Sequence, residues 1–181
     1  MYSDIINTVK AILNNRKRKR LATLIAILLV LAISFFAIKE PAFTDPTCSV
    51  LVSKDNTLLA ATIASDEQYR FPPSQDIPQK FTSCIIEFED RHFFNHPGIN
   101  PFSIARAAWN NIKAKKIVQG GSTITMQVIR LYRKGKDRTI FEKVIEAILA
   151  LRLEATSSKN KILSMYTSNA PFGGNVVGLN A

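Results

Sequence analysis

The sequence predicts a mainly α-helical domain that follows a single membrane-spanning helix. An uncharged run covers residues 21–38. Apolar residues recur at helical spacing in several segments after residue 76, and one stretch, residues 49–63, has the pattern of a β-hairpin. These observations divide the chain into a basic cytoplasmic tail (1–20), a transmembrane helix (21–38), a linker (39–47) and a folded domain (48–181).

The uncharged run from Leu21 to Ile38 is long enough to cross a bilayer. At 1.5 Å per residue it makes a helix of about 27 Å, close to the roughly 30 Å hydrocarbon core. It is long for the apolar part of a cleaved signal peptide, the alternative interpretation, and no small-x-small site follows closely. The basic run Arg16–Arg20 predicts a cytoplasmic N-terminus. We therefore expect a single-pass anchor in the cytoplasmic membrane, with the domain outside it.

The charge distribution favours an anionic partner for the domain. The formal net charge is +10, but six of the 24 basic residues and one of the 14 acidic residues lie in the first 38 positions. Half of the excess therefore belongs to the rest of the chain, where an extracytoplasmic location excludes cytosolic nucleic acid and leaves lipid headgroups or phosphorylated substrates. Cys48 and Cys84 show no metal or redox spacing, and a disulfide between them stays open.

The start of the domain predicts a linker, a hairpin and a first helix. Prolines identify the linker Pro41–Pro46, and the β-prone runs Ser49–Ser53 and Thr57–Ile63 flank a short polar turn. After a break at Phe71, Asp76 is a candidate N-cap for a helix with Ile77 and Pro78 in its first turn. The spacing i, i+3, i+4 and i+7 predicts a buried helix face, made of Phe81, Cys84, Ile85 and Phe88.

Asn100 as N-cap and Pro101 as first residue predict a second helix. Its apolar positions share one face: Phe102, Ala105, Ala108, Trp109 and Ile112. The apolar face is thus expected to be the inner one. The charges on the outer face, which include Arg106 and Lys113, are consistent with a solvated surface as well as with binding.

Three further helices are expected. The glycines before Ser122 suit a turn into a helix through Ile124 and Val128. Thr139 and Glu142 form a capping box before an apolar helix, and Lys159–Tyr166 predicts a short helix, with a loop at residues 169–175. The apolar positions after the capping box are Phe141, Val144, Ile145, Ile148, Leu149 and Leu151. Taken alone, Glu146 among them is more easily explained as a solvent-facing residue of a good helix former.

The stretch Glu89–Asn100, EDRHFFNHPGIN, is poor core material, because it combines adjacent carboxylates, two histidines and a Pro-Gly turn. Such a mixture requires either a functional site or a very wet loop. Arg130–Arg138 adds five positive charges that only Asp137 opposes.

Together these segments resemble the peptidoglycan glycosyltransferase domain, glycosyltransferase family 51, of class A penicillin-binding proteins. EDRHFFNHPGIN looks like the first motif of the family, GGSTITMQ the second, KVIEAILALRLE the third and KILSMYTSNAPFGGN the fourth. Met126-Gln127 and the loop Ala170–Asn175 look most like the penicillin-binding protein 1C branch.

The resemblance implies a lysozyme-like, mostly helical fold that polymerises lipid II and releases undecaprenyl pyrophosphate with inversion. Glu89 matches the general base that takes the proton from an attacking sugar hydroxyl, a weak nucleophile. The partners implied are lipid II, the growing glycan strand and membrane lipid, with other cell-wall synthesis proteins as further candidates, in the bacterial inner membrane.

Further motif positions carry over residue by residue. Arg130, Arg138 and Lys143 match basic positions suited to a pyrophosphate leaving group, and Glu146 matches the second carboxylate, which reverses the interpretation from the helix alone. The polar matches are Asp90, His96, Ser122 and Gln127; His96 fits a structural hydrogen bonder better than a proton carrier. No cofactor is required, and no metal cage is indicated, although a divalent cation such as Mg²⁺ is compatible with the pyrophosphate.

Some positions depart from the family pattern. The third motif usually has basic residues where this chain has Glu142 and Ile145, and the fourth has Tyr-Leu-Asn where this chain has Tyr166, Thr167 and Ser168. No fifth motif and no transpeptidase signature follow, so we expect the domain to be C-terminally incomplete. A catalytically inactive, membrane-anchored binding or scaffold fragment therefore stays open as an alternative. Glycan hydrolysis is disfavoured, because a neutral leaving group needs a protonated acid rather than cations.

Overall fold

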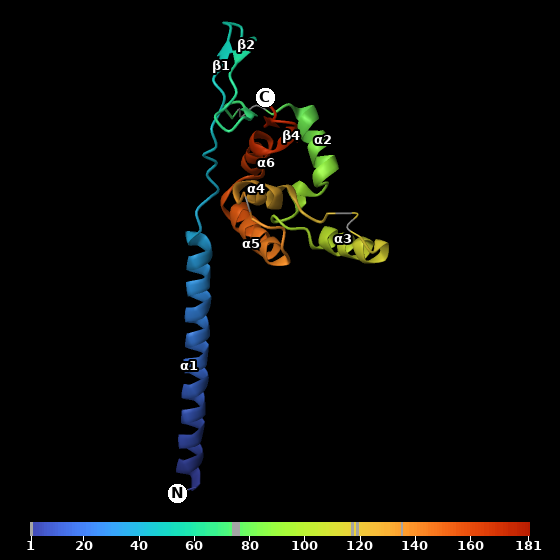
Figure 1. Ribbon diagram of the computed structural model, residues 1–181. Coiled ribbons are helices and arrows are strands. Elements are labelled where there is room, and N and C mark those ends of the chain that lie inside the picture. Colours follow the sequence, from blue (N-terminus) through green and yellow to red (C-terminus); the bar gives the residue numbers. More distant parts are fainter. Residues whose placement is uncertain (1, 74–76, 117, 119, 135) are drawn as a thin grey trace. The chain divides into compact units, whose positions relative to one another are not determined.

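The computed structural model describes residues 2–73, 77–116, 118, 120–134 and 136–181. The chain forms two compact units, Met1–Lys39 and Glu40–Ala181. The first unit is built on α1 (Tyr2–Ala37), which continues without a break from the basic segment into the apolar one (Figure 1). Its portion Arg16–Ala37 is long and apolar enough to cross a membrane. The prediction of an N-terminal helix that could span a membrane is confirmed.

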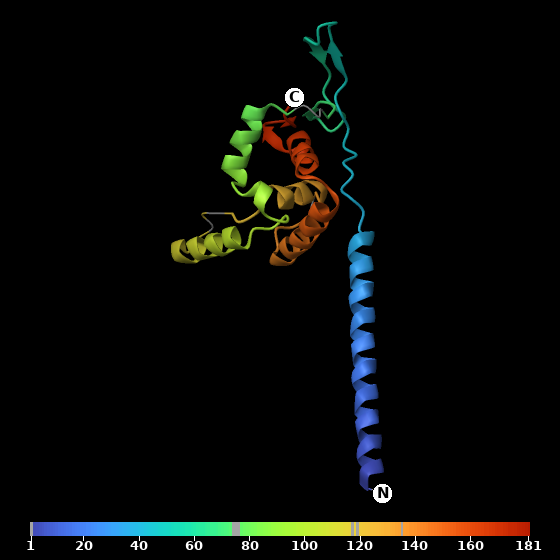
Figure 2. The ribbon, with the colours of Figure 1, turned by 180° about the vertical axis from the view of Figure 1, so that it is seen from behind.

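Helices dominate the second unit, as the sequence predicts. Its centre consists of α4 (Ile124–Tyr132), α5 (Ile140–Thr156) and α6 (Lys159–Asn169), which pack on one another (Figures 1 and 2). Fully buried side chains of this centre include Phe93, Ile124, Met126, Ile129, Leu153 and Ile162. Phe93 belongs to a 3-10 turn, Phe93–Asn95, so the motif stretch after Glu89 is anchored in the core.

Local capping rules account for where several helices begin. Asn100 precedes α3 (Pro101–Ala114) and accepts a hydrogen bond from the Ser103 N–H at 3.1 Å. Thr139 precedes α5 and accepts from the Glu142 N–H at 3.1 Å. Both predicted caps are confirmed. Each satisfies one of the amides that a helix start leaves without an intrahelical partner.

The second unit also contains two small sheets. The predicted hairpin is confirmed: β1 (Val50–Val52) pairs antiparallel with β2 (Leu58–Ala61). A second sheet joins β3 (Tyr69–Arg70) in parallel to β5 (Val176–Val177), which also pairs antiparallel with β4 (Pro171–Gly173). The prediction of a loop at 169–175 is therefore wrong for residues 171–173, since strands of two or three residues are too short to show a period.

The predicted start of α2 (Gln79–Glu89) is wrong, and its predicted buried face is wrong at two of four positions. Pro78 precedes the helix as its N-cap, so Ile77 and Pro78 lie outside it, and Asp76 lies outside the described residues. Cys84 is exposed, and Phe88 is 86% exposed. Ile85, a member of the predicted face, packs partly against the core, and so does its neighbour Ile86. Helical spacing predicts an apolar stripe, but the neighbouring elements decide which side of the stripe is covered.

Cys48 is buried, and both cysteines are free thiols.

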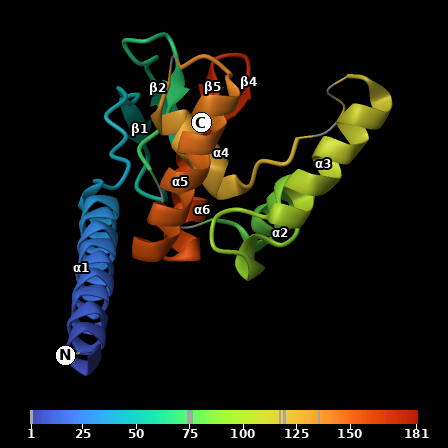
Figure 3. The same ribbon diagram turned by 90° about the horizontal axis from the view of Figure 1, so that it is seen from below.

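The predicted buried face of α3 is wrong in the same way. Phe102 is 87% exposed, Trp109 70% and Ile112 73%, and the buried position of this helix is Ala107. Figures 1 and 3 show α3 extending away from the cluster of α4, α5 and α6. Its apolar stripe therefore faces outward. The first turns of α5 behave similarly, since Phe141, Val144 and Ile148 are exposed.

Candidate functional site

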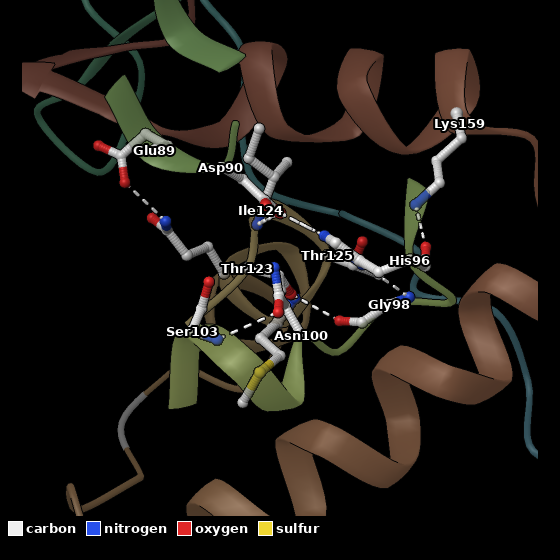
Figure 4. Close-up of polar contacts among 12 residues, drawn as sticks. Glu89, Asp90, His96, Gly98, Asn100, Ser103, Thr123, Ile124, Thr125 and Lys159 are labelled. Atoms are coloured by element: carbon white, nitrogen blue, oxygen red, sulfur yellow. Dashed lines mark hydrogen bonds and ion pairs between the residues drawn. The ribbon is translucent and has the colours of Figure 1, made fainter. Parts of the chain in front are cut away.

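Asp90 joins the end of α2 to the start of α4. Its buried carboxylate accepts from His96 Nε2, at 2.9 Å and 3.0 Å to its two oxygens, and from the Ile124 N–H at 3.1 Å (Figure 4). The Gly98 N–H donates to His96 Nδ1 at 3.2 Å. Both ring nitrogens of His96 are thus occupied, with the proton on Nε2. This geometry fits the structural role expected for His96.

Two residues that the sequence did not mark as functional hold the loop around His96 and Gly98 by hydrogen bonds. Thr123 Oγ1 donates to the Gly98 carbonyl at 2.6 Å, and Lys159 Nζ donates to the His96 carbonyl at 2.7 Å (Figure 4). Gly98 has a φ of +94°, and a Cβ there would lie 2.7 Å from the Ala150 carbonyl oxygen. Glycine at this position therefore permits both the backbone conformation and the close approach to α5.

Glu89 is the last residue of α2, and a side chain of α4 holds its half-buried carboxylate. Gln127 Nε2 donates to Glu89 Oε2 at 2.8 Å (Figure 4). Because a carboxylate only accepts, the amide nitrogen of Gln127 must face it. Burial, and secondarily the charge of Glu89, raises the pKa of Tyr166 on α6 to about 12. Tyr166, which the sequence placed only in a helix and a motif, thus contributes a neutral phenol near the candidate base.

Four other candidate residues meet in a second cluster, which we call the anion cluster: Ser122, Arg130, Lys143 and Glu146. Ser122 Oγ lies 2.9 Å from Lys143 Nζ and 3.2 Å from Arg130 Nη2, and accepts from both. Arg130 Nε lies 3.3 Å from Glu146 Oε1. The interpretation of Glu146 as solvent-facing is wrong, because its side chain is 12% exposed. The Arg130 cation offsets the cost of that burial.

The two clusters share α4. Gln127 and Arg130 are three residues apart on this helix, so they lie on one face with Cβ atoms about 5–6 Å apart. One of them holds Glu89, and the other holds Ser122 and Glu146. The structure therefore brings together eight of the nine candidate residues around α4, with Asp90 at its N-terminus and His96 behind Asp90.

The remaining basic residues of the segment 130–138 behave differently. Arg133 forms an ion pair with Glu142, and Lys134 forms one with Asp45 at 2.7 Å. Arg138 is exposed and forms no hydrogen bond or ion pair with another described residue, so the structure does not draw it into the anion cluster. Within the described ranges, no group of three or more His, Cys, Asp and Glu side chains could hold a metal ion.

The chain belongs to the transglycosylase family. The family model described as "Transglycosylase" matches residues 55–181, which include every candidate residue above.

Its relatives are penicillin-binding proteins. Penicillin-binding protein 1C of Escherichia coli (strain K12) is 41% identical over 133 residues, 73% of this chain and 17% of that protein. Penicillin-binding protein 1A of Aquifex aeolicus (strain VF5) is 41% identical over 115 residues, 63% and 16% respectively. Penicillin-binding protein 1B of Escherichia coli (strain K12) is 33% identical over 129 residues, 71% and 14%. The resemblance to this family is confirmed, and the chain spans less than a fifth of the length of these relatives.

Proposed function

We propose that the second unit is a peptidoglycan glycosyltransferase that polymerises lipid II into glycan chains, with inversion at the donor sugar and release of undecaprenyl pyrophosphate. The family match supports the reaction class. The observation that carries the assignment to this site is the position of Glu89: Gln127 holds its carboxylate at 2.8 Å, one helical turn from the cation Arg130.

Glu89 is the proposed general base. A sugar hydroxyl attacks the anomeric carbon of the donor only if a positioned group takes its proton, and a carboxylate within hydrogen-bond reach can do so. Gln127 acts as a positioning residue, because its donated hydrogen bond restricts the rotation of the Glu89 carboxylate. Attack from the face opposite the departing pyrophosphate inverts the anomeric centre and needs no covalent intermediate.

The anion cluster is the proposed site of the leaving group. A departing pyrophosphate carries concentrated negative charge, so fixed cations and hydrogen-bond donors stabilise it without a general acid. Arg130 and Lys143 already converge on the Ser122 hydroxyl, and pyrophosphate oxygens would replace or join that oxygen. Glu146 holds Arg130 in place, and Arg138, an exposed residue outside the cluster, is a further candidate cation for the leaving group. A divalent cation such as Mg²⁺ would supply additional positive charge to the pyrophosphate, but these residues need no cofactor.

Asp90 and His96 hold the backbone elements that carry the site. Asp90 and His96 fix the end of α2 against the start of α4, so Glu89 and Gln127 belong to elements that cannot shift independently. In the cell we propose a single-pass anchor in the bacterial inner membrane with a cytoplasmic N-terminus. The partners would be lipid II, the growing glycan strand, membrane lipid and other cell-wall synthesis proteins.

Lipid II polymerisation by the detergent-solubilised full chain tests the proposal. We expect glycan chains from the wild type and a loss of at least about 100-fold in kcat for Glu89→Gln. Glu87→Gln is the matched control, because Glu87 lies on the same helix and pairs with Arg91 at an exposed site. Equal activity of Glu89→Gln and wild type would remove Glu89 as the base. Saturable lipid II binding by the wild type without any polymer would instead select the inactive scaffold.

A further inference from the structure

Two ion pairs connect α4 and α5 side by side. Arg130 pairs with Glu146, and Arg133, the C-cap of α4, pairs with Glu142. Arg130 and Arg133 are three residues apart on the chain, and Glu142 and Glu146 are four apart on α5. Each set therefore lies about one helical turn apart on one face. The second pair is consequently a direct neighbour of the anion cluster.

The Arg133–Glu142 pair uses much of the guanidinium's binding capacity. Arg133 Nη2 lies 2.9 Å from both carboxylate oxygens of Glu142, and Arg133 Nε lies 3.1 Å from Oε2. The side chains are 24% and 17% exposed, so water screens the contact only in part. Charge-assisted forked contacts of this kind are among the stronger ones in proteins. Arg133 is therefore committed to Glu142 rather than directed toward Ser122.

Glu142 is also stabilised by its place in α5. It lies in the first turn of this helix, and its N–H donates to Thr139 Oγ1 at 3.1 Å. The N-terminal end of a helix carries partial positive charge, which favours an anion at this point. Two sources of positive potential thus converge on a carboxylate of the chain itself, one residue before Lys143 of the anion cluster.

We infer that Glu142 is a built-in competitor of the anionic ligand. It withholds Arg133 from the anion cluster, and it thereby limits how tightly the cluster retains a pyrophosphate group. The identification of that group as pyrophosphate rests on the proposed function. Weak retention has a use in a polymerising enzyme, because each cycle must release the product before the next donor binds.

Direct binding of inorganic pyrophosphate to the full chain in detergent tests this inference. Isothermal titration calorimetry at neutral pH and one fixed low salt concentration compares the wild type with four variants. We expect Glu142→Gln to bind pyrophosphate roughly three- to tenfold more tightly than the wild type, because Arg133 is released. In the double variant Arg133→Gln/Glu142→Gln, the affinity should return to within about twofold of the wild type. Arg133→Gln alone should bind no more tightly than the wild type, since it leaves the Glu142 carboxylate unpaired beside the cluster.

Several results would overturn the inference. These are an unchanged affinity of Glu142→Gln, a double variant as tight as Glu142→Gln, tighter binding by Arg133→Gln alone, or no saturable pyrophosphate binding by the wild type. Glu87→Gln, which breaks an exposed pair elsewhere, should leave the affinity unchanged. Circular dichroism verifies that each variant is folded, and Arg133→Gln gives a second readout because it leaves Glu142 in place. Failure of the wild type to polymerise lipid II, with the expected binding pattern intact, would refute the proposed function alone.

Discussion

Gln127 has a role at the residue scale that its motif position alone does not reveal. Its amide is directed at Glu89, so the proposed base has one preferred orientation before any substrate binds. Replacement by Leu keeps a similar volume and removes the donor. For Gln127→Leu we expect kcat to fall by roughly 10- to 100-fold with little change in KM, because a small displacement of a reacting group has a large effect on rate. Steady-state kinetics of lipid II polymerisation measure this split.

A contrary result for Gln127 is easy to recognise. If KM rises and kcat is unchanged, the amide binds substrate and does not orient the base. Gln68 offers a matched control outside the site: its side chain is not among the groups that contact Glu89, and Gln68→Leu should leave both constants unchanged.

Tyr166 provides a readout of Glu89 that needs no substrate. Its phenol has a pKa raised to about 12, first by burial and then by the Glu89 charge. The pKa of Tyr166 in the folded protein exceeds the usual unfolded pKa of about 10. The neutral phenol therefore makes its full contribution to stability below about pH 10, and this contribution declines as the pH rises toward 12. Ultraviolet titration should show a step near pH 12 that belongs to Tyr166. Tyr166→Phe should remove that step, and Glu89→Gln should move it to lower pH.

The titration separates proximity from catalysis. An unchanged Tyr166 step in Glu89→Gln would mean that the charge of the carboxylate does not affect the pKa of the phenol, whatever the activity of the variant. Tyr132→Phe is the control, because this residue is 45% exposed and lies at the far end of α4.

At the scale of elements, the carboxylate of Asp90 connects α2, the motif loop and α4. We expect Asp90→Ala to lower the free energy of unfolding by about 3 kcal/mol, because it leaves His96 Nε2 and the Ile124 N–H without their buried acceptor. Chemical denaturation followed by circular dichroism measures the loss. Asp137→Ala, at an exposed position of the loop before α5, should change stability by less than about 0.5 kcal/mol. Equal losses in the two variants would contradict the role of Asp90.

Features that depend on residues close in sequence could be predicted, and features that depend on packing between distant elements could not. The caps Asn100 and Thr139 and the hairpin turn depend on neighbours in sequence, so they could be predicted. The covered sides of α2 and α3 depend on where other elements lie, so apolar spacing assigned Phe88 and Trp109 wrongly to the core. The partners of the site residues, such as Glu142 for Arg133, are also separated in sequence. Residue spacing in one sequence does not reveal such contacts.

At the scale of the whole molecule, the outward apolar face of α3 fits contact with membrane lipid, one of the proposed partners. Trp109 is the single tryptophan of the chain and is 70% exposed on that face. In nanodiscs we expect brominated lipids to quench its fluorescence more strongly than a water-soluble quencher does. Preferential quenching by the water-soluble reagent would place the α3 face in solvent and contradict the prediction.

The nine-residue helix α4 gives the site an all-or-none character. Its first amide binds Asp90, Gln127 holds Glu89, Arg130 reaches Ser122 and Glu146, and Arg133 at its end holds Glu142. Adding or deleting one residue inside this helix would rotate everything beyond that point by about 100°. The base, the leaving-group site and the Arg133–Glu142 pair would then lose their alignment together. Indels should thus be far less tolerated in α4 than in the hairpin or in the loop before α5, where the chain can change length without altering a single one of these contacts.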